Sequence, residues 1–323
     1  MCSSDLLMKL SLISSGKALG QREIHNEHFV SYLDTTDQWI RERSGISTRR
    51  WVDDESTVDL AFAASEECLS RLPDFDRSKI KVVICATVTP DEVVPAISAQ
   101  LQDLLGLDTD ILAFDINAAC SGLVYALEIA RNLLRVRPAG TAALVLGAEM
   151  LSRKTDMQDR GSCFLFGDGA GASLWTLHEG EDDYFSAKTV GDTEMLTVGL
   201  NEPIRMDGRA VFRFAVSKMS DCIRDVLEKA DLAPDQVDYY LLHQANQRIN
   251  DAIMRDLKLT GERFPSNIAR VGNTSSASIG ILMEELYSSG QLDGSKTICL
   301  AGFGGGMSCG ALLMKGHEIH VVG

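Results

Sequence analysis

One pattern occurs twice along the chain, and this repeat constrains the fold more than any other feature. Thr87 and Asn117 are 30 positions apart, as are His243 and Asn273, and each pair joins the end of an apolar run to an asparagine that opens a helix pattern. Short apolar runs indicate buried strands, and apolar residues at spacings of three and four indicate helices. The sequence therefore predicts two copies of one mixed α/β unit, although unrelated α/β stretches could share this spacing.

The match continues beyond the two asparagines. Asn117-Ala-Ala-Cys corresponds to Asn273-Thr-Ser-Ser, and Gly147 near the end of its strand corresponds to Gly302. If the halves pack about a pseudo-dyad, the strand ends that carry Cys120 and the second asparagine converge on one pocket.

The remaining hydrophobic pattern divides the chain into two halves and a connection. An acidic, glycine-bearing and weakly periodic stretch indicates the loop between them. We expect an N-terminal half at 1–177, a connecting loop at 178–208 and a C-terminal half at 209–323. Helices are expected at 57–71, 96–105, 123–130, 211–230 and 246–257, and strands at 81–87, 111–116, 142–149, 237–242, 297–301 and 311–314.

Cys120 lies where the apolar run at 111–116 meets a helix pattern. A helix N-terminus presents unpaired amide hydrogens and partial positive charge, which favour the thiolate. We therefore expect a lowered pKa and a reactive thiol at Cys120. The alternative is a small apolar residue in a tight turn, because free cysteines are often buried.

Composition excludes several classes of function. The eight cysteines include no Cys-x-x-Cys pair and no histidine at metal-ligand spacing, so we expect neither a disulfide framework nor a metal site. A net charge of -15 argues against nucleic acid as a partner. No stretch approaches the ~18 apolar residues of a membrane span, and residues 1–5 lack the features of a secretory signal. We expect a cytoplasmic protein without a membrane partner.

Two arginine-containing patterns suggest binding surfaces. Trp39 and Arg43 share one face of a short expected helix, where an indole beside a guanidinium can hold a flat aromatic group, or simply pack. Arg248 and Arg255 are seven positions apart on one helical face. They form a local basic stripe that could meet an acidic partner, or they are solvated surface arginines.

Seven motifs follow one another along nearly the whole chain. They are Asp-Thr-Thr-Asp-Gln-Trp-Ile at 34–40, Asn-Ala-Ala-Cys-Ser-Gly at 117–122, Asp-Arg-Gly at 159–161, Phe-Gly-Asp-Gly-Ala-Gly-Ala at 166–172, His-Gln-Ala-Asn at 243–246, Gly-Asn-Thr-Ser-Ser-Ala-Ser at 272–278 and Gly-Phe-Gly-Gly-Gly at 302–306. In this order they resemble the β-ketoacyl-acyl carrier protein (ACP) synthase III family. The resemblance implies a thiolase-like fold of two similar mixed-sheet α/β halves in five layers (αβαβα), assembled as a homodimer.

The resemblance also implies an activity. Such an acyltransferase joins an acyl-coenzyme A (acyl-CoA) primer, either acetyl-CoA or a short or branched acyl-CoA, to malonyl-ACP by decarboxylative Claisen condensation. The products are 3-oxoacyl-ACP, CO2 and CoA, and the reaction initiates fatty acid biosynthesis. Cys120 would be the nucleophile, with His243 and Asn273 donating hydrogen bonds to the malonyl thioester. Backbone amides of Cys120 and Gly305 would form the oxyanion hole, with no cofactor beyond the CoA thioester substrates.

Binding residues follow from the same resemblance. Trp39 and Arg160 would sandwich the CoA adenine, Arg43 and Asn246 would line the pantetheine path, and Val94 and Phe303 would form the acyl pocket. The residues expected to bind ACP are Arg213, Gln244, Arg248 and Arg255.

Two departures from the family pattern affect the primer. The segment at 191–208 is shorter than the usual loop over the pocket, and Val94 stands where phenylalanine often reaches into the partner subunit's pocket. We expect the smaller side chain to leave room for branched or longer primers.

Three alternatives remain open from the sequence. The first is a related condensing enzyme of secondary metabolism, which would load an unusual acyl group as a polyketide or quinolone starter, or use malonyl-CoA. The second is a papain-like Cys-His-Asn hydrolase, although the sequence around Cys120 lacks that family's pattern. The third is a catalytically silent binding module, although all three expected catalytic positions are filled.

Overall fold

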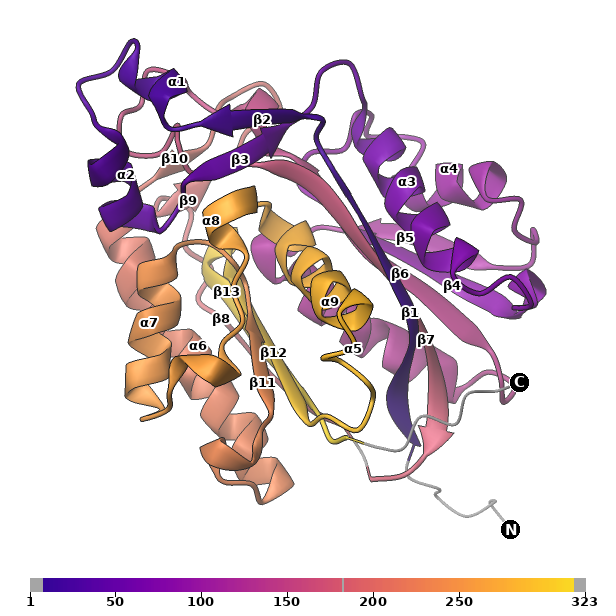
Figure 1. The fold of residues 1–323 in the computed structure, drawn as a ribbon. Coiled ribbons are helices and arrows are strands. Elements are labelled where there is room, and N and C mark those ends of the chain that lie inside the picture. The colour runs from indigo at the N-terminus through magenta and orange to yellow at the C-terminus, as the bar shows by residue number, and fades with distance from the viewer. Residues whose placement is uncertain (1–7, 182, 317–323) are drawn as a thin grey trace.

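Two mixed β-sheets form the body of the molecule in the computed structural model, which describes residues 8–181 and 183–316 (Figure 1). In each sheet the strands run antiparallel at one side and parallel at the other. The first sheet has the order β1 (Met8–Leu19), β7 (Asp168–Glu179), β6 (Ala142–Met150), β4 (Ile80–Ala86) and β5 (Leu112–Ile116). The second has the order β8 (Tyr184–Thr189), β13 (Ser308–Met314), β12 (Ile298–Gly304) and β11 (Tyr239–Leu242).

Helices complete five layers, as the family resemblance implied (Figure 1). The outer layers are α3 (Thr57–Ser70) with α4 (Ile97–Leu104) on the first sheet, and α6 (Gly208–Ala230) with α7 (Gln247–Asp256) on the second. Between the sheets lie α5 (Gly122–Arg135) and α9 (Ser278–Ser288). Most residues of α9 are buried because both of its sides face a sheet, whereas α5 is amphipathic and exposes polar residues such as Asn132.

Smaller elements lie outside the five layers. β2 (Arg22–His25) pairs with β3 (Thr48–Trp51), and the short helices are α1 (Glu27–Val30), α2 (Asp37–Ser44) and α8 (Ile268–Val271). None of the helices in the described ranges is long and apolar enough to cross a membrane. Cys2 and the N-terminal residues used to exclude a secretory signal lie outside the described residues.

The internal repeat is confirmed in detail. Both sheets share one strand order and one set of strand directions, apart from β5, which has no counterpart among the strands described in the second sheet. Asn117 Oδ1 accepts the Ala119 amide hydrogen at 3.2 Å, and Asn273 Oδ1 accepts that of Ser275 at 2.9 Å. Ala119 and Ser275 both have positive φ angles, 48° and 50°. The two asparagines therefore brace the same left-handed turn in each half.

Paired glycines bring the halves into contact. A Cβ atom on Gly147 would lie 2.4 Å from the Ser276 carbonyl oxygen, and one on Gly302 would lie 3.3 Å from that of Cys120. Each half thus places a glycine of its own sheet, Gly147 in β6 or Gly302 in β12, against the turn of the other half. Only a residue without a side chain permits the approach at Gly147.

The expected connecting loop at 178–208 is wrong in part. β7 continues to Glu179, and Tyr184–Thr189 forms β8, which pairs with β13 and belongs to the second sheet. The second half therefore begins at Tyr184, not at residue 209. An edge strand that packs on one face carries a weak hydrophobic signal, which explains the error.

Farther along, β9 (Leu196–Thr197) and β10 (Arg205–Met206) form a two-stranded sheet.

Candidate active site

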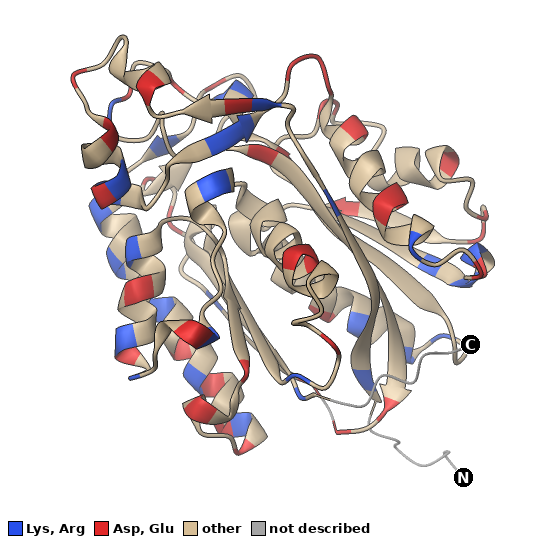
Figure 2. Ribbon diagram, in the orientation of Figure 1, with Lys and Arg blue, Asp and Glu red and all other residues tan. Residues whose placement is uncertain are grey.

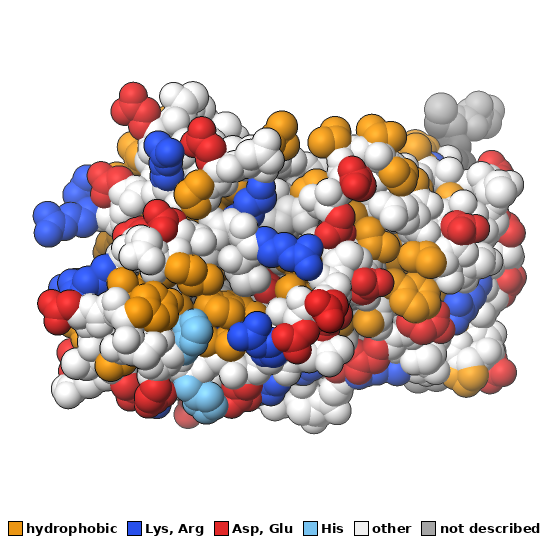
Figure 3. All heavy atoms as spheres, turned by 90° about the horizontal axis from the view of Figure 1, so that it is seen from above, with side chains coloured by type: hydrophobic (Ala, Val, Ile, Leu, Met, Phe, Trp, Pro, Cys, Tyr) orange, Lys and Arg blue, Asp and Glu red, His pale blue; other side chains and the backbone are white. Residues whose placement is uncertain are grey.

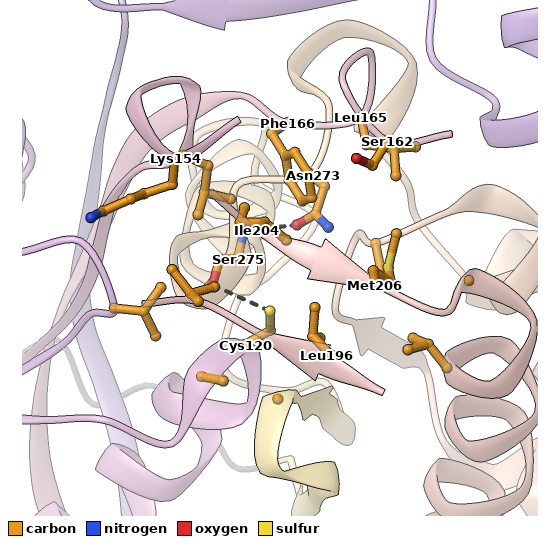
Figure 4. Close-up of a pocket in the computed structure, with 18 of the residues that line it drawn as sticks. Cys120, Lys154, Ser162, Leu165, Phe166, Leu196, Ile204, Met206, Asn273 and Ser275 are labelled. Carbon is orange, nitrogen blue, oxygen red and sulfur yellow. Dashed lines mark hydrogen bonds between the residues drawn. The ribbon is translucent and has the colours of Figure 1, made fainter. Parts of the chain in front are cut away.

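A cavity of about 1180 Å³ lies between residues of both halves. Its lining includes Cys120, His243, Asn273 and Phe303, so the structure brings together the three side chains that the sequence predicted to converge. Figure 4 shows Cys120 and Asn273 approaching this space from opposite halves of the fold, with Ser275 between them.

Cys120 sits in a 3-10 turn, Ala119–Ser121, that joins β5 to α5. Of the seven cysteines in the described ranges, it alone is not fully buried. Its surroundings nevertheless withhold solvent from a thiolate, and this burial raises the pKa of the Cys120 thiol to about 12, with a further contribution from the negative charge of Glu149. The expected lowering of this pKa is therefore wrong, because desolvation outweighs the hydrogen bonds from Ser275 and from the Cys120 backbone.

The end of β12 lies directly against the nucleophile turn. A Cβ atom on Gly304 would be 2.6 Å from the backbone nitrogen of Cys120. Gly305 follows and lines the cavity. This close backbone packing places the peptide units around Gly305 beside the Cys120 amide, as an oxyanion hole requires.

His243 follows β11, and its backbone nitrogen donates to the Ala301 carbonyl at 2.8 Å. Nδ1 lies 2.7 Å from Ser278 Oγ, which also accepts the Gln244 amide hydrogen at 3.3 Å. The Ser278 hydroxyl has no other acceptor among the hydrogen bonds of the described residues, so we assign its proton to Nδ1. The imidazole proton then resides on Nε2.

Burial lowers the pKa of His243 to about 3. Because this value lies far below neutral pH, the ring is uncharged under working conditions. His243 is therefore a neutral hydrogen-bond donor through Nε2, and this assignment leaves it no free nitrogen with which to accept a proton.

Asn273 is held by backbone bonds on both sides. Its N–H donates to the Leu165 carbonyl at 2.8 Å, and its carbonyl accepts the Gly167 N–H at 2.9 Å. Since Oδ1 accepts the Ser275 amide hydrogen, Nδ2 remains available to donate toward the cavity. Asn273 and His243 thus supply two neutral donors to one space.

Trp39 and Arg43 line the outer part of the cavity, whereas Arg160 lies on the Trp39 ring. The Arg160 guanidinium carbon is 4.5 Å from the ring centre, and that of Arg43 is 5.5 Å away. A base between two flat groups needs roughly 7 Å, two contacts of about 3.5 Å. Arg160 must therefore move off the indole before both residues can sandwich an adenine.

Asn246 also lines the cavity, but its side chain is engaged within the protein. Its Oδ1 accepts the Arg248 amide hydrogen at 3.0 Å and caps α7, while Nδ2 donates to the Arg43 carbonyl at 3.0 Å. The residue therefore fixes α7 against α2 at the expected pantetheine path.

Of the four residues expected to bind ACP, three are exposed and one is buried. Arg213, Arg248 and Arg255 are exposed on α6 and α7. Figure 2 shows several basic positions along these two helices, and basic side chains project at the edge where Figure 1 places α2 and α7 (left in Figure 3). Gln244 is fully buried, so its expected surface role is wrong. Its side-chain amide lies two residues beyond the end of β11, where it donates to the Leu242 carbonyl and accepts from the Ser266 hydroxyl.

The two residues expected in the acyl pocket also separate. Phe303 lines the cavity, and its ring centre is 5.4 Å from that of His243. Val94 is 81% exposed and does not line the cavity of its own chain. The short segment at 191–208 still covers this cavity, since Leu196, Ile204 and Met206 line it (Figure 4).

Sequence reasoning missed Glu149, Ser275 and Ser278. Ser275 Oγ lies 3.2 Å from Cys120 Sγ and 2.9 Å from Glu149 Oε1. The sequence did contain a signal for Glu149, because it is the one charged residue in the expected strand at 142–149. The two serines lie in the motif at 272–278, in which only Asn273 had been given a role.

Within the described ranges, no group of three or more His, Cys, Asp or Glu side chains could hold a metal ion.

Comparison with known proteins identifies the family. Residues 114–192 match the family model 3-oxoacyl-[acyl-carrier-protein (ACP)] synthase III, and residues 227–315 match the model of its C-terminal part. The β-ketoacyl-ACP synthase III of Streptococcus suis is 40% identical over 316 residues, 92% of this chain and 96% of the relative.

Solved structures agree with the sequence matches. The 3-oxoacyl-ACP synthase III of Aquifex aeolicus superposes with a TM-score of 0.89 at 36% identity, covering 95% of this chain and 99% of that one. The priming β-ketosynthase of the R1128 polyketide pathway has a TM-score of 0.89 at 29% identity, covering 98% and 99%. The chain belongs to the β-ketoacyl-ACP synthase III family.

Proposed function

We propose that this chain condenses an acyl-CoA primer with malonyl-ACP to give 3-oxoacyl-ACP, CO2 and CoA, the step that initiates fatty acid biosynthesis. The observation that carries the proposal is one cavity lined by an accessible cysteine and two neutral donors, Cys120 with His243 and Asn273. The chain is an acyltransferase of the condensing type, as its relatives are named.

In the first half-reaction, the Cys120 thiolate attacks the carbonyl carbon of the acyl-CoA thioester. The amides of Cys120 and Gly305 receive the oxyanion of the tetrahedral intermediate, and CoA departs as its thiolate. The acyl group stays on Cys120 Sγ. One difficult condensation is thereby divided into two easier steps.

In the second half-reaction, the malonyl thioester oxygen accepts hydrogen bonds from His243 Nε2 and Asn273 Nδ2. Loss of CO2 moves an electron pair into the thioester, and these donors stabilise the resulting enolate. Its carbon then attacks acyl-Cys120 and expels the cysteine thiolate. Neutral donors suit this step because they need no change of protonation between substrate and enolate.

Substitutions of the two donors test this division of labour. We expect His243→Ala and Asn273→Ala to form the acyl-enzyme from radioactive acetyl-CoA, but to release CO2 from malonyl-ACP about 100-fold more slowly, a typical cost of losing one preorganised donor. Cys222→Ala, at a buried cysteine outside the cavity, is the control. Decarboxylation by Asn273→Ala at the wild-type rate would refute its assigned role.

The docking surface proposed for ACP is the basic face of α6 and α7. Arg248 lines the cavity, and its guanidinium carbon lies 5.8 Å from the centre of the Phe212 ring. This contact connects the start of α7 with the start of α6. Arg213 and Arg255 extend the same basic face on an otherwise acidic chain. This local field would orient an acidic carrier with its pantetheine toward the cavity.

Charge reversal tests this surface. Arg255→Glu should raise the KM for malonyl-ACP about tenfold, because a repulsive contact replaces an attractive one, while acyl transfer from acyl-CoA keeps its rate. Lys79→Glu makes the same charge change at an exposed residue next to β4 and serves as the matched control. Equal KM values for the two variants would count against docking on α7.

We also propose a homodimer formed along β5. This edge strand exposes apolar side chains, among them Leu112 at 40%, and Val93 and Val94 are 77% and 81% exposed near the same edge. Pairing with a second copy would cover them and would bring Val94 to the partner subunit. A monomer in sedimentation equilibrium at micromolar concentration would contradict this assembly.

Primer choice follows from Val94 in that dimer. We expect kcat/KM values for isobutyryl-CoA and hexanoyl-CoA within about tenfold of that for acetyl-CoA, because a methylene in an apolar pocket changes discrimination by only about 1–3 kcal/mol. Val94→Phe should shift the preference toward acetyl-CoA, whereas Val136→Phe, exposed at the far end of α5, should not. A wide preference of the wild type for acetyl-CoA would reject the idea.

A role in secondary metabolism is the second candidate, supported by the structural likeness to the polyketide-priming enzyme. The higher identity to synthases named β-ketoacyl-ACP synthase III favours fatty acid initiation. Under either proposal the substrates are acyl-CoA and a malonyl thioester, no cofactor is needed, and the cytoplasm supplies both.

A further inference from the structure

The hydroxyl of Ser275 connects a buried carboxylate, Glu149, to the nucleophile Cys120. Glu149 is the penultimate residue of β6 and has no exposed surface. Ser275 Oγ bridges the two groups, 2.9 Å from Glu149 Oε1 and 3.2 Å from Cys120 Sγ (Figure 4 draws the contact with sulfur). Neither Glu149 nor Ser275 takes part in the two half-reactions proposed for condensation.

Hydrogen-bond donors hold Glu149, and no lysine or arginine of the described ranges forms an ion pair with it. Oε2 accepts from the Thr89 hydroxyl at 2.6 Å and from the Val88 amide at 3.1 Å. Oε1 accepts from the Ser276 hydroxyl at 2.7 Å as well as from Ser275. Burial raises the pKa of this carboxyl, so it binds a proton more readily than a carboxylate in solvent.

The Ser275 hydroxyl has one proton and two neighbours. When it donates to Glu149, its oxygen is free to accept the thiol proton of Cys120. When it donates to sulfur instead, its oxygen can accept a proton from a neutral Glu149 carboxyl. The same three side chains therefore fit both the thiol–carboxylate state and the thiolate–carboxylic acid state.

We propose that Ser275 and Glu149 form a proton relay that receives the thiol proton of Cys120, an inference that rests on the proposed function. The thiol proton passes to Ser275 Oγ as the hydroxyl proton passes to Glu149 Oε1. The S–H bond breaks, an O–H bond forms on the carboxyl, and Ser275 ends as it began.

Charge explains why the relay favours ionisation. Loss of the proton to solvent would leave two negative charges, on sulfur and on Glu149, in one poorly solvated site. Transfer to Glu149 keeps a single negative charge and only moves it to sulfur. The tautomer assigned to His243 leaves that residue no nitrogen to accept this proton, so the relay supplies a role that it cannot fill.

The proton balance closes over the whole reaction. CoA departs as a thiolate and takes a proton from water, while Glu149 remains protonated beside the acyl-enzyme. When the enolate carbon attacks, the cysteine thiolate is expelled and recovers its proton from Glu149 through Ser275. Each turnover therefore consumes one solvent proton, the one that leaves with CoA.

Alkylation of Cys120 by iodoacetamide as a function of pH tests the relay, because the reagent reports the thiolate and requires neither CoA nor ACP. In the wild type we expect the rate to level off near neutral pH, since internal transfer to Glu149 does not depend on pH. Glu149→Gln should lose this plateau, with a rate that falls tenfold per pH unit and is about 100-fold lower at pH 7.

A purely electrostatic role of Glu149 predicts the opposite sign. Removing a negative charge beside the thiol would lower the thiol pKa and make Glu149→Gln alkylate faster at pH 7. Burial raises the pKa of Cys85, with smaller contributions from the charges of Asp115 and Glu149. Because Cys85 is also near Glu149 but fully buried, peptide mapping is used to assign the reaction to Cys120. Faster or unchanged alkylation of Glu149→Gln would overturn the relay.

Two serine variants decide the matter if Glu149→Gln does not fold. Ser275→Ala breaks the connection to sulfur, whereas Ser276→Ala removes a hydrogen bond to the same Glu149 oxygen, 2.7 Å against 2.9 Å for Ser275, that does not involve Cys120. We expect loss of the plateau only in Ser275→Ala, and equal profiles would overturn the relay. A wild type with this plateau that cannot condense acetyl-CoA with malonyl-ACP would retain the relay and refute the proposed function.

Discussion

The packing of each half's sheet against the turn of the other half is the constraint on which the site depends. Gly147 abuts the Ser276 turn, and Gly302 and Gly304 abut the Cys120 turn. Because the turns are held by backbone contact, their side chains meet the end of β11, where His243 sits, in a fixed arrangement. A cavity between the halves follows from this crossed packing.

Electrostatics inside the cavity are set by exclusion of water. Burial keeps His243 neutral and raises the pKa of the Cys120 thiol, so the resting site holds a protonated nucleophile and uncharged donors. Such a site stabilises an oxyanion or an enolate strongly once it forms. The same burial makes thiolate formation costly, which gives the nearby carboxylate of Glu149 its significance.

The repeated 30-residue spacing was sufficient to predict two halves of one design, and the motifs were sufficient to predict that Cys120, His243 and Asn273 line one cavity. The edge strand β8 was missed because its period-two signal is weak. Gln244 was misplaced because a motif does not show which of its residues is buried. The shift in the pKa of Cys120 was predicted with the wrong sign, since desolvation depends on packing by residues that are far apart in the sequence.

The most direct test of the account is the fate of an acetyl group supplied as acetyl-CoA. Mass spectrometry of the digested protein should find one acetyl group per chain, on the peptide that contains Cys120. Adding malonyl-ACP should discharge it with release of an equal amount of CO2. Acetylation at another residue, or discharge as free acetate without CO2, would contradict the central claim that the two halves build one condensing site around this sulfur.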